Sequence, residues 1–219
     1  MAEPYRRHDL VRADPAAWAA LLDARPDLVA VPHLRGWAEA GRPFVVRRRV
    51  PGEDAGAVPL GLPLPPADGK RRIGLALPEE ALTALSPMSL IDVAGDAPAA
   101  WRPAIRDLVA IGAGHGIVPR SFGGLLWQAV TGLTYLTATS DLDLLWPCRE
   151  AVPTGLLTQI RTIADVAPMR IDGEILLPDG FGLHWRELLE APAGGSVLAK
   201  SVDALALRPV DALRVPVAA

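Results

Sequence analysis

The sequence predicts a mixed α/β fold of the α+β class, with a small N-terminal unit and a larger C-terminal one. Half of the 219 residues are apolar and 21% are charged, which is typical of a globular protein with a sizeable core. The 22 prolines and 20 glycines predict many short elements joined by turns. In the second half, helical and strand-like spacings of apolar residues alternate along the chain.

The N-terminal unit, residues 1–92, is expected to contain two short helices and two strands. Asp14 is a suitable N-cap, with Pro15 at the first helical position. Gly41 is placed to end the second helix. The expected elements are helix 14–24, helix 32–40, strand 43–49, a Pro/Gly-rich loop or hairpin over 51–70, and strand 71–77.

The C-terminal unit, residues 93–219, alternates helices and strands. Apolar residues recur at helical spacing in its helices, and SDLDLLW begins with the strict alternation of a half-buried strand. The expected elements are helix 98–113, strand 117–122, helix 125–133, strand 140–146, helix 152–166, strand 169–177 and strand 197–200.

Composition also bears on function and location. The net charge of −3 argues against a nucleic-acid partner held by broad electrostatic attraction, although a local basic pocket stays compatible with it. Cys148 is the only cysteine, which excludes an intrachain disulfide. The first residues lack the apolar run of a signal peptide, and no uncharged apolar stretch reaches the about 18 residues of a membrane span. We therefore expect a cytoplasmic protein without a membrane partner.

Two pairs of acidic residues are candidate metal ligands. In a strand, Asp141 and Asp143 point to the same face, roughly 6–7 Å apart at Cα. Paired carboxylates suit Mg²⁺, which takes oxygen ligands and keeps positions open for substrate phosphates. A third carboxylate would complete a two-metal site. Asp172 and Glu174 also share a strand face, and periodicity does not separate them.

Upstream, Gly123 and Gly124 stand where a strand runs into a helix. Glycines at such a turn let backbone N–H groups approach a phosphate. A Gly-Gly pair or a D-x-D motif alone is weak evidence. Their order along the chain (strand, Gly-Gly, helix, strand with D-x-D, helix, strand with a further acid) resembles the polymerase-β-like nucleotidyltransferase superfamily, whose catalytic domain has a mixed sheet flanked by helices.

A closer resemblance covers nearly the whole chain. SFGGLLWQAVTGLTYLTATSDLDLLW resembles the central motif of the malonate decarboxylase holo-acyl-carrier-protein synthases, also called phosphoribosyl-dephospho-CoA transferases. RRHDLVR, VVRRR, LGLPLP, RIDGEI, HWREL and VLAKS resemble segments of that family in the same order. One departure is Gly124, where the superfamily often has serine, so the role of this position stays open.

The resemblance implies a definite reaction. The donor would be 2′-(5″-triphosphoribosyl)-3′-dephospho-CoA, and the acceptor a serine of the apo acyl-carrier subunit of malonate decarboxylase, with release of diphosphate. Asp141 and Asp143 would bind two Mg²⁺ ions, and Asp172, or Glu174, would ligate the ion near the attacking serine. The alternatives are a nucleotidyltransferase with another acceptor and a catalytically silent binding module.

Four basic residues are candidate phosphate or substrate ligands: Arg47, Arg49, Arg120 and Lys200. Arginine forks match phosphate oxygens well, although basic residues on a solvated edge strand are a common alternative. We expect the N-terminal unit to pack over the active site, because Arg47 and Arg49 otherwise lack an evident partner. His8 is a possible acid or base, and His184 a possible nucleotide-site residue.

Overall fold

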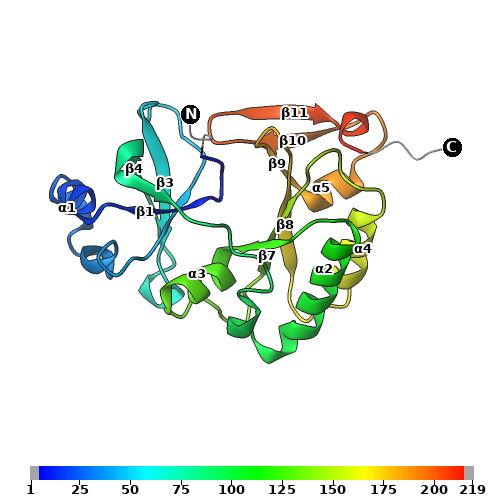
Figure 1. The fold of residues 1–219 in the computed structure, drawn as a ribbon, viewed down its shortest axis with the longest axis horizontal. Helices are drawn as coiled ribbons and strands as arrows, with labels where there is room; N and C mark the ends of the chain where they lie inside the picture. The colour runs from blue at the N-terminus through cyan, green and yellow to red at the C-terminus, as the bar shows by residue number, and fades with distance from the viewer. Residues whose placement is uncertain (1–4, 215–219) are drawn as a thin grey trace.

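The structure, a computed structural model that describes residues 5–214, contains two β-sheets with helices packed around them (Figure 1). The expected α+β class is confirmed. The helices are α1 (Pro15–Asp23), α2 (Arg102–Gly114), α3 (Gly123–Thr131), α4 (Leu156–Ala164) and α5 (Trp185–Glu190). Short 3-10 helices are η1 (Pro26–Leu28), η2 (Leu34–Gly36), η3 (Pro66–Asp68), η4 (Glu79–Ala81), η5 (Ala94–Asp96), η6 (Ala99–Trp101) and η7 (Val210–Ala212). Within the described part of the chain, no helix has the length and apolar character needed to cross a membrane.

The first sheet is antiparallel, with the strand order β4-β3-β2-β1-β5. Its strands are β1 (Leu10–Ala13), β2 (Phe44–Val46), β3 (Ala57–Pro63), β4 (Arg72–Pro78) and β5 (Leu82–Ala84). The Pro/Gly-rich segment forms a hairpin, in which β3 pairs with β4 along its whole length. β2 is shorter than the predicted strand 43–49, so the three arginines that follow it lie outside the sheet.

The second sheet has the strand order β11-β10-β9-β8-β7-β6. Its strands are β6 (Arg120–Phe122), β7 (Leu142–Pro147), β8 (Ile171–Leu176), β9 (Gly182–His184), β10 (Ser196–Lys200) and β11 (Leu205–Pro209). β7 and β8 are parallel, because α4 lies between them in the chain, and the other neighbours are antiparallel. The sheet is therefore mixed, as the sequence predicts.

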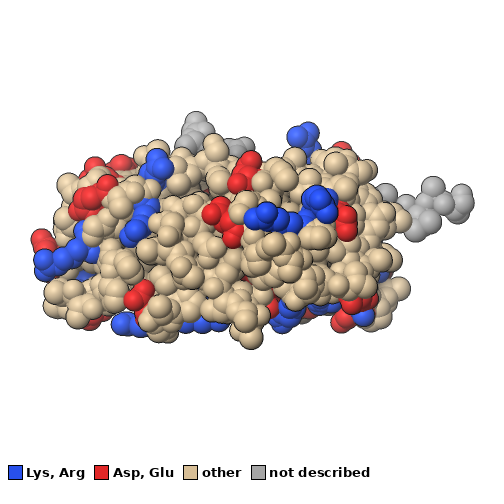
Figure 2. Space-filling model, turned by 90° about the horizontal axis from the view of Figure 1, so that it is seen from below, with Lys and Arg blue, Asp and Glu red and all other residues tan. Residues whose placement is uncertain are grey.

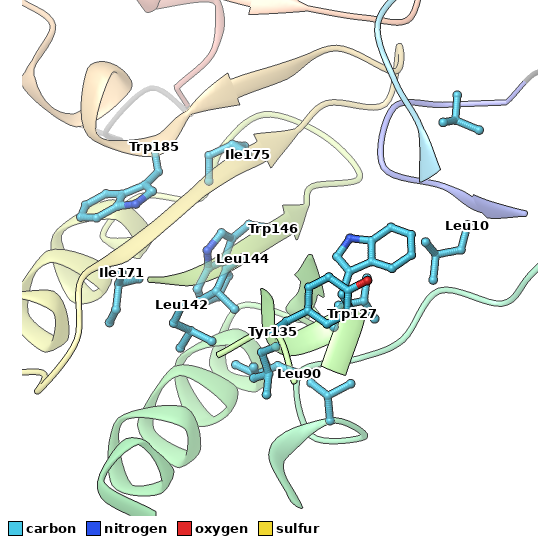
Figure 3. Close-up of a cluster of buried hydrophobic side chains, with 14 of the residues drawn as sticks. Leu10, Leu90, Trp127, Tyr135, Leu142, Leu144, Trp146, Ile171, Ile175 and Trp185 are labelled. Atoms are coloured by element: carbon cyan, nitrogen blue, oxygen red, sulfur yellow. The ribbon is translucent and has the colours of Figure 1, made fainter. Parts of the chain in front are cut away.

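The two faces of this second sheet differ in chemistry. Leu142, Leu144 and Trp146 alternate along β7 and are fully buried, in one cluster with Ile171 and Ile175 of β8 (Figure 3). Helices α2, α4 and α5 cover that face, whereas α3 and the first sheet lie on the other side (Figure 1). Because side chains alternate in a strand, the acidic residues of β7 and β8 point toward the N-terminal half.

One hydrophobic core joins the two halves of the chain. The Trp37 and Trp127 rings lie 6.3 Å apart between centroids, and the Tyr135 hydroxyl donates a hydrogen bond to the carbonyl oxygen of Pro63 at 2.9 Å. The boundary that we expect near residue 92 falls between β5 and β6 and stays a prediction. The acidic face of the second sheet is thus held against the N-terminal half by shared packing.

Some predicted elements match the structure and others do not. The capped helix after Asp14 is confirmed, since Asp14 Oδ1 accepts a hydrogen bond from the Ala17 N–H at 2.9 Å. The predicted helix 32–40 is wrong in extent: only η2 forms, after His33 in a left-handed conformation with φ 66°. β9, α5 and β11 were not predicted, because each is short and carries a weak periodic pattern.

Candidate active site

The acidic residues of the D-x-D and R-I-D motifs meet at one end of the second sheet. Asp143 of β7 is paired in register with Asp172 of the parallel strand β8, so their side chains lie next to each other on one face. Asp141 directly precedes β7, one residue outside the strand. Three carboxylates therefore converge from two neighbouring strand ends.

Arg170 connects the outer two of these carboxylates. Its Nη2 atom lies 2.7 Å from Oδ2 of Asp172 and 2.9 Å from Oδ2 of Asp141. The Arg170 side chain is 63% exposed, so this contact lies at the open edge of the site. Arg170 is not among the predicted site residues, although its position two residues before Asp172 places it on the same side of the strand.

The environment of Asp143 disfavours its charge. Burial raises the pKa of Asp143, the carboxylates of Asp172 and Asp141 raise it further, and together they bring it to about 7. A hydrogen bond from the Gly124 backbone N–H and the charge of Arg170 act in the opposite direction. Three carboxylates share one arginine, Arg170, at this site, and this favours binding of a further cation.

Gly123 and Gly124 begin helix α3 beside Asp143. Gly123 has φ +70°, and a Cβ atom there would lie 1.9 Å from Asp143 Oδ2. At Gly124, φ is not left-handed, and a Cβ atom would meet the Leu136 Cδ2 atom at 3.2 Å. The two glycines therefore have different roles: position 123 requires glycine, whereas position 124 has room for a small side chain if Leu136 shifts slightly.

The donor atoms at this site suit magnesium in chemical type. Asp141, Asp143 and Asp172 supply carboxylate oxygens, the ligands that Mg²⁺ prefers. Across residues 5–214, however, no three His, Cys, Asp or Glu side chains are already arranged to hold a metal ion. Arg170 occupies the space between Asp141 and Asp172, so joint binding of an ion would require its exposed guanidinium to move away.

Glu174 shares this face of β8 but has other partners. Its Oε1 atom lies 2.9 Å from Arg7 Nη2, and its Oε2 atom lies 3.2 Å from His8 Nε2. Burial alone would raise the pKa of Glu174, but the hydrogen bonds and charges of His8 and Arg7 outweigh it and lower the pKa to about 2. Arg7 and His8 therefore bring the N-terminal segment onto the site face.

His184 orients Asp172 from the neighbouring strand β9. Its Nε2 atom lies 2.8 Å from Asp172 Oδ1, and its Nδ1 atom accepts a hydrogen bond from the Glu187 backbone N–H at 3.4 Å. This network assigns the proton to Nε2, which donates to the carboxylate. Asp172 is thus held from two sides, by His184 and by Arg170.

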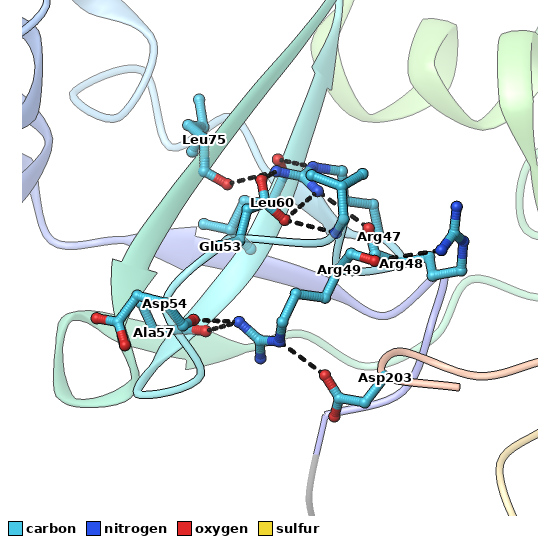
Figure 4. Close-up of polar contacts among 10 residues, drawn as sticks. Arg47, Arg48, Arg49, Glu53, Asp54, Ala57, Leu60, Leu75 and Asp203 are labelled. Atoms are coloured by element: carbon cyan, nitrogen blue, oxygen red, sulfur yellow. Dashed lines mark hydrogen bonds and ion pairs between the residues drawn. The ribbon is translucent and has the colours of Figure 1, made fainter. Parts of the chain in front are cut away.

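Arg47 and Arg49 have partners within the chain (Figure 4). Arg47 Nη1 pairs with Glu53 at 2.8 Å, and Arg49 Nε pairs with Asp203 at 2.7 Å. The expectation that these arginines lack a partner is therefore wrong, because β2 ends at Val46 and the chain turns toward its own carboxylates. Their contact with substrate stays a prediction.

Arg120 and Lys200 lie on the same face of the second sheet as the acidic residues. Arg120 pairs in register with Leu145, and Lys200 is linked to this face through its register with Gly182. The Lys200 carbonyl oxygen accepts a hydrogen bond from Arg7 Nη1 at 3.2 Å. Neither side chain has an ion-pair partner among the described residues.

The charged surface is mixed. On the face shown in Figure 2, acidic and basic side chains lie beside each other, and neither sign covers a continuous area. This agrees with the small net charge of −3. A site that works by local geometry fits such a surface better than one that relies on a broad field.

Comparison with known proteins identifies the family. Residues 6–87 match the family model "Phosphoribosyl-dephospho-CoA transferase MdcG N-terminal domain", and residues 87–211 match its C-terminal domain. The chain belongs to the phosphoribosyl-dephospho-CoA transferase family. This confirms the family expected from the motifs and makes the protein a transferase.

Several relatives named phosphoribosyl-dephospho-CoA transferase align with this chain over most of their length. A phosphoribosyl-dephospho-CoA transferase of Bradyrhizobium diazoefficiens is 39% identical over 93% of this chain and 90% of the relative. One from Xanthomonas campestris pv. campestris is 40% identical over 94% and 95%. One from Pseudomonas putida is 28% identical over 71% and 78%. No solved structure is significantly similar to the chain.

Proposed function

We propose that this transferase moves the phosphoribosyl-dephospho-CoA group from 2′-(5″-triphosphoribosyl)-3′-dephospho-CoA to a serine hydroxyl of the apo acyl-carrier subunit of malonate decarboxylase. The observation that carries the proposal is the pairing of Asp143 with Asp172, beside Asp141 and the glycine turn that begins α3. The family name supports the transferred group. The carrier protein as acceptor, and the cytoplasm as the place of reaction, stay predictions.

In this reaction the serine oxygen forms a bond to the α-phosphorus, the bond from that phosphorus to the diphosphate breaks, and the serine proton leaves. Such transfers depend on positioning and charge neutralisation more than on covalent help from the protein. Gly123 and Gly124 allow the backbone at the start of α3 to approach the phosphates. Lys200 is a further proposed phosphate ligand.

We propose two Mg²⁺ ions as cofactor, held by Asp141, Asp143 and Asp172. When bound, they would neutralise charge on the phosphate oxygens. Burial and the neighbouring carboxylates of Asp172 and Asp141 raise the Asp143 pKa to about 7, and this crowding of carboxylates supports the proposal.

Asp172 is our candidate for the third ligand and for the group that receives the serine proton. His184 and Arg170 hold its carboxylate beside Asp143. Glu174 is less suitable because its pKa of about 2 makes it a poor base and because its partners Arg7 and His8 are largely buried, whereas Arg170 beside Asp172 is exposed and free to move.

The test is a mass measurement on the apo carrier protein after incubation with the transferase, Mg²⁺ and the donor. We expect a serine-linked adduct with the wild type and none with Asp141→Ala/Asp143→Ala. Arg106→Gln, which removes an exposed charge on α2, is the matched control and should behave as wild type. Donor turnover without a carrier adduct would indicate another acceptor, and a protein that binds donor without turnover would be a silent module.

A further inference from the structure

A cavity of about 90 Å³ lies beside the carboxylate site, under the N-terminal segment. Residues 6–10 and the connection at Pro87 and Met88 form one side of it. The other side is formed by the sheet, with Arg120 of β6 and Leu145 of β7 paired in register. The three carboxylates of the metal site are not among the lining residues.

The cavity holds more positive than negative charge. Arg6, Arg7 and Arg120 line it together with one carboxylate, that of Asp9. Arg7 is already paired with Glu174 at 2.9 Å. Arg6 and Arg120 make no side-chain hydrogen bond or ion pair within residues 5–214, and Asp9 instead accepts a hydrogen bond from the Arg6 backbone N–H at 2.7 Å.

Arg120 is half-buried, and this makes its lack of a partner informative. Burial lowers the pKa of the Arg120 guanidinium, while the charge of Asp9 acts in the opposite direction. A guanidinium that loses water without gaining a hydrogen-bonded partner costs free energy. An anion bound between Arg120 and Arg6 would offset that cost.

Size and position indicate what this anion can be. A cavity of about 90 Å³ has room for several water molecules, since one needs about 10–15 Å³ on the same measure, and therefore for a phosphate group. Leu145 is two residues along β7 from Asp143, roughly 6–7 Å by strand rise. One elongated ligand can therefore reach both the cavity and the carboxylates.

We propose that Arg120 and Arg6 bind a phosphate group of the dephospho-CoA portion of the donor, in a subsite separate from the carboxylates where the triphosphate reacts. This inference rests on the proposed function. Arginine is suited to the role because its planar donors match phosphate oxygens. The apolar lining by Met88, Leu145 and Leu176 leaves the guanidinium groups as the attractive charges in the cavity.

The test is calorimetric titration of the full chain with two separate probes, dephospho-CoA without divalent metal and inorganic diphosphate with Mg²⁺. Arg120→Gln and Arg6→Gln should each weaken dephospho-CoA binding at least about tenfold, the usual effect of losing a charged hydrogen bond. Both variants should bind diphosphate as wild type does, because that probe reports on the reacting phosphates. Arg106→Gln, with an exposed charge on α2, should change neither affinity.

The subsite would be overturned if the wild-type protein did not bind dephospho-CoA, or if the arginine variants bound it as tightly as wild type does. It would also be overturned if the variants lost affinity for dephospho-CoA and diphosphate equally, because that result would place the arginines at the leaving diphosphate. Thermal unfolding monitors folding, and Arg6→Gln decides the question if Arg120→Gln does not fold, because Arg6 is exposed. A carrier adduct from wild type with unchanged dephospho-CoA affinity in both variants would keep the proposed function and reject the subsite. Weaker dephospho-CoA binding in the arginine variants, together with no carrier adduct from wild type, would keep the subsite and reject the proposed function.

Discussion

Gly123 and Asp143 fit together only because position 123 has no side chain. A Cβ atom on Gly123 would lie 1.9 Å from Asp143 Oδ2, and the residue has φ +70°, a conformation that favours glycine. The Gly124 N–H that follows favours the charged form of the Asp143 carboxylate and acts to lower its pKa. The turn before α3 and the central carboxylate therefore depend on each other for their positions.

The two glycines should respond differently to substitution. Gly123→Ala should lower the free energy of unfolding by about 2 kcal/mol and abolish transfer, because it adds backbone strain and displaces Asp143. Gly124→Ser should fold and remain active, since its new Cβ atom meets only the Leu136 methyl group at 3.2 Å. Urea denaturation and the carrier mass shift measure both effects. Equal loss in the two variants would contradict the separate roles.

Asp143→Asn should stabilise the metal-free protein at neutral and alkaline pH. The folded-state pKa of Asp143, about 7, lies above its ordinary value of 3.8, so the folded state binds more protons than the unfolded state between these values. The free-energy cost of the ionised Asp143 carboxylate in the folded state therefore grows from about pH 4 to pH 7 and is constant at higher pH. With a discount for partial exposure, we expect a gain of about 1–2 kcal/mol at pH 8 that disappears near pH 4. Denaturation of both proteins from pH 4 to pH 8 measures this gain. Equal free energies of unfolding for Asp143→Asn and wild type at pH 8 would contradict the raised pKa of Asp143.

Arg170→Gln should make the protein more responsive to magnesium. Arg170 neutralises Asp141 and Asp172, and its loss leaves three carboxylates facing one another. Because the pair is largely exposed, the metal-free protein should lose only about 1 kcal/mol or less. The rise in Tm on adding Mg²⁺ should be larger than in wild type. The same rise in wild type, Arg170→Gln and the Arg106→Gln control would argue against an ion at this site.

Glu174→Gln should loosen the N-terminal segment. The pKa of Glu174 is lowered to about 2, so its charge stabilises the folded state above the ordinary value of 4.5, and this contribution is lost as pH falls toward 2. The substitution leaves Arg7 and His8 without their charged partner, at a cost of about 2–4 kcal/mol at pH 7. The difference from wild type should shrink progressively below pH 4.5. Equal free energies of unfolding for Glu174→Gln and wild type at every pH would show that the pair contributes nothing.

The local sequence pattern was sufficient to predict which acidic residues at the centre of the site share a strand face. Strand alternation places Asp141 and Asp143 on one face, and the same rule places Asp172 and Glu174 on one face of the next strand. The glycine turn and the order of elements indicated the superfamily, which stays a prediction. The motifs indicated the family, which the comparisons confirm. The shared strand faces and the family motifs depend on residues close together in the sequence, so the sequence by itself determined them.

Only the tertiary structure decided which partners these residues have. Glu174 meets Arg7 and His8 across more than 160 positions of sequence, and His184 reaches Asp172 through the register of β9 on β8. Arg47 and Arg49 turn to Glu53 and Asp203. Strand register and the path of the N-terminal segment set these contacts. Both result from packing between distant segments, about which the period of a single strand carries no information.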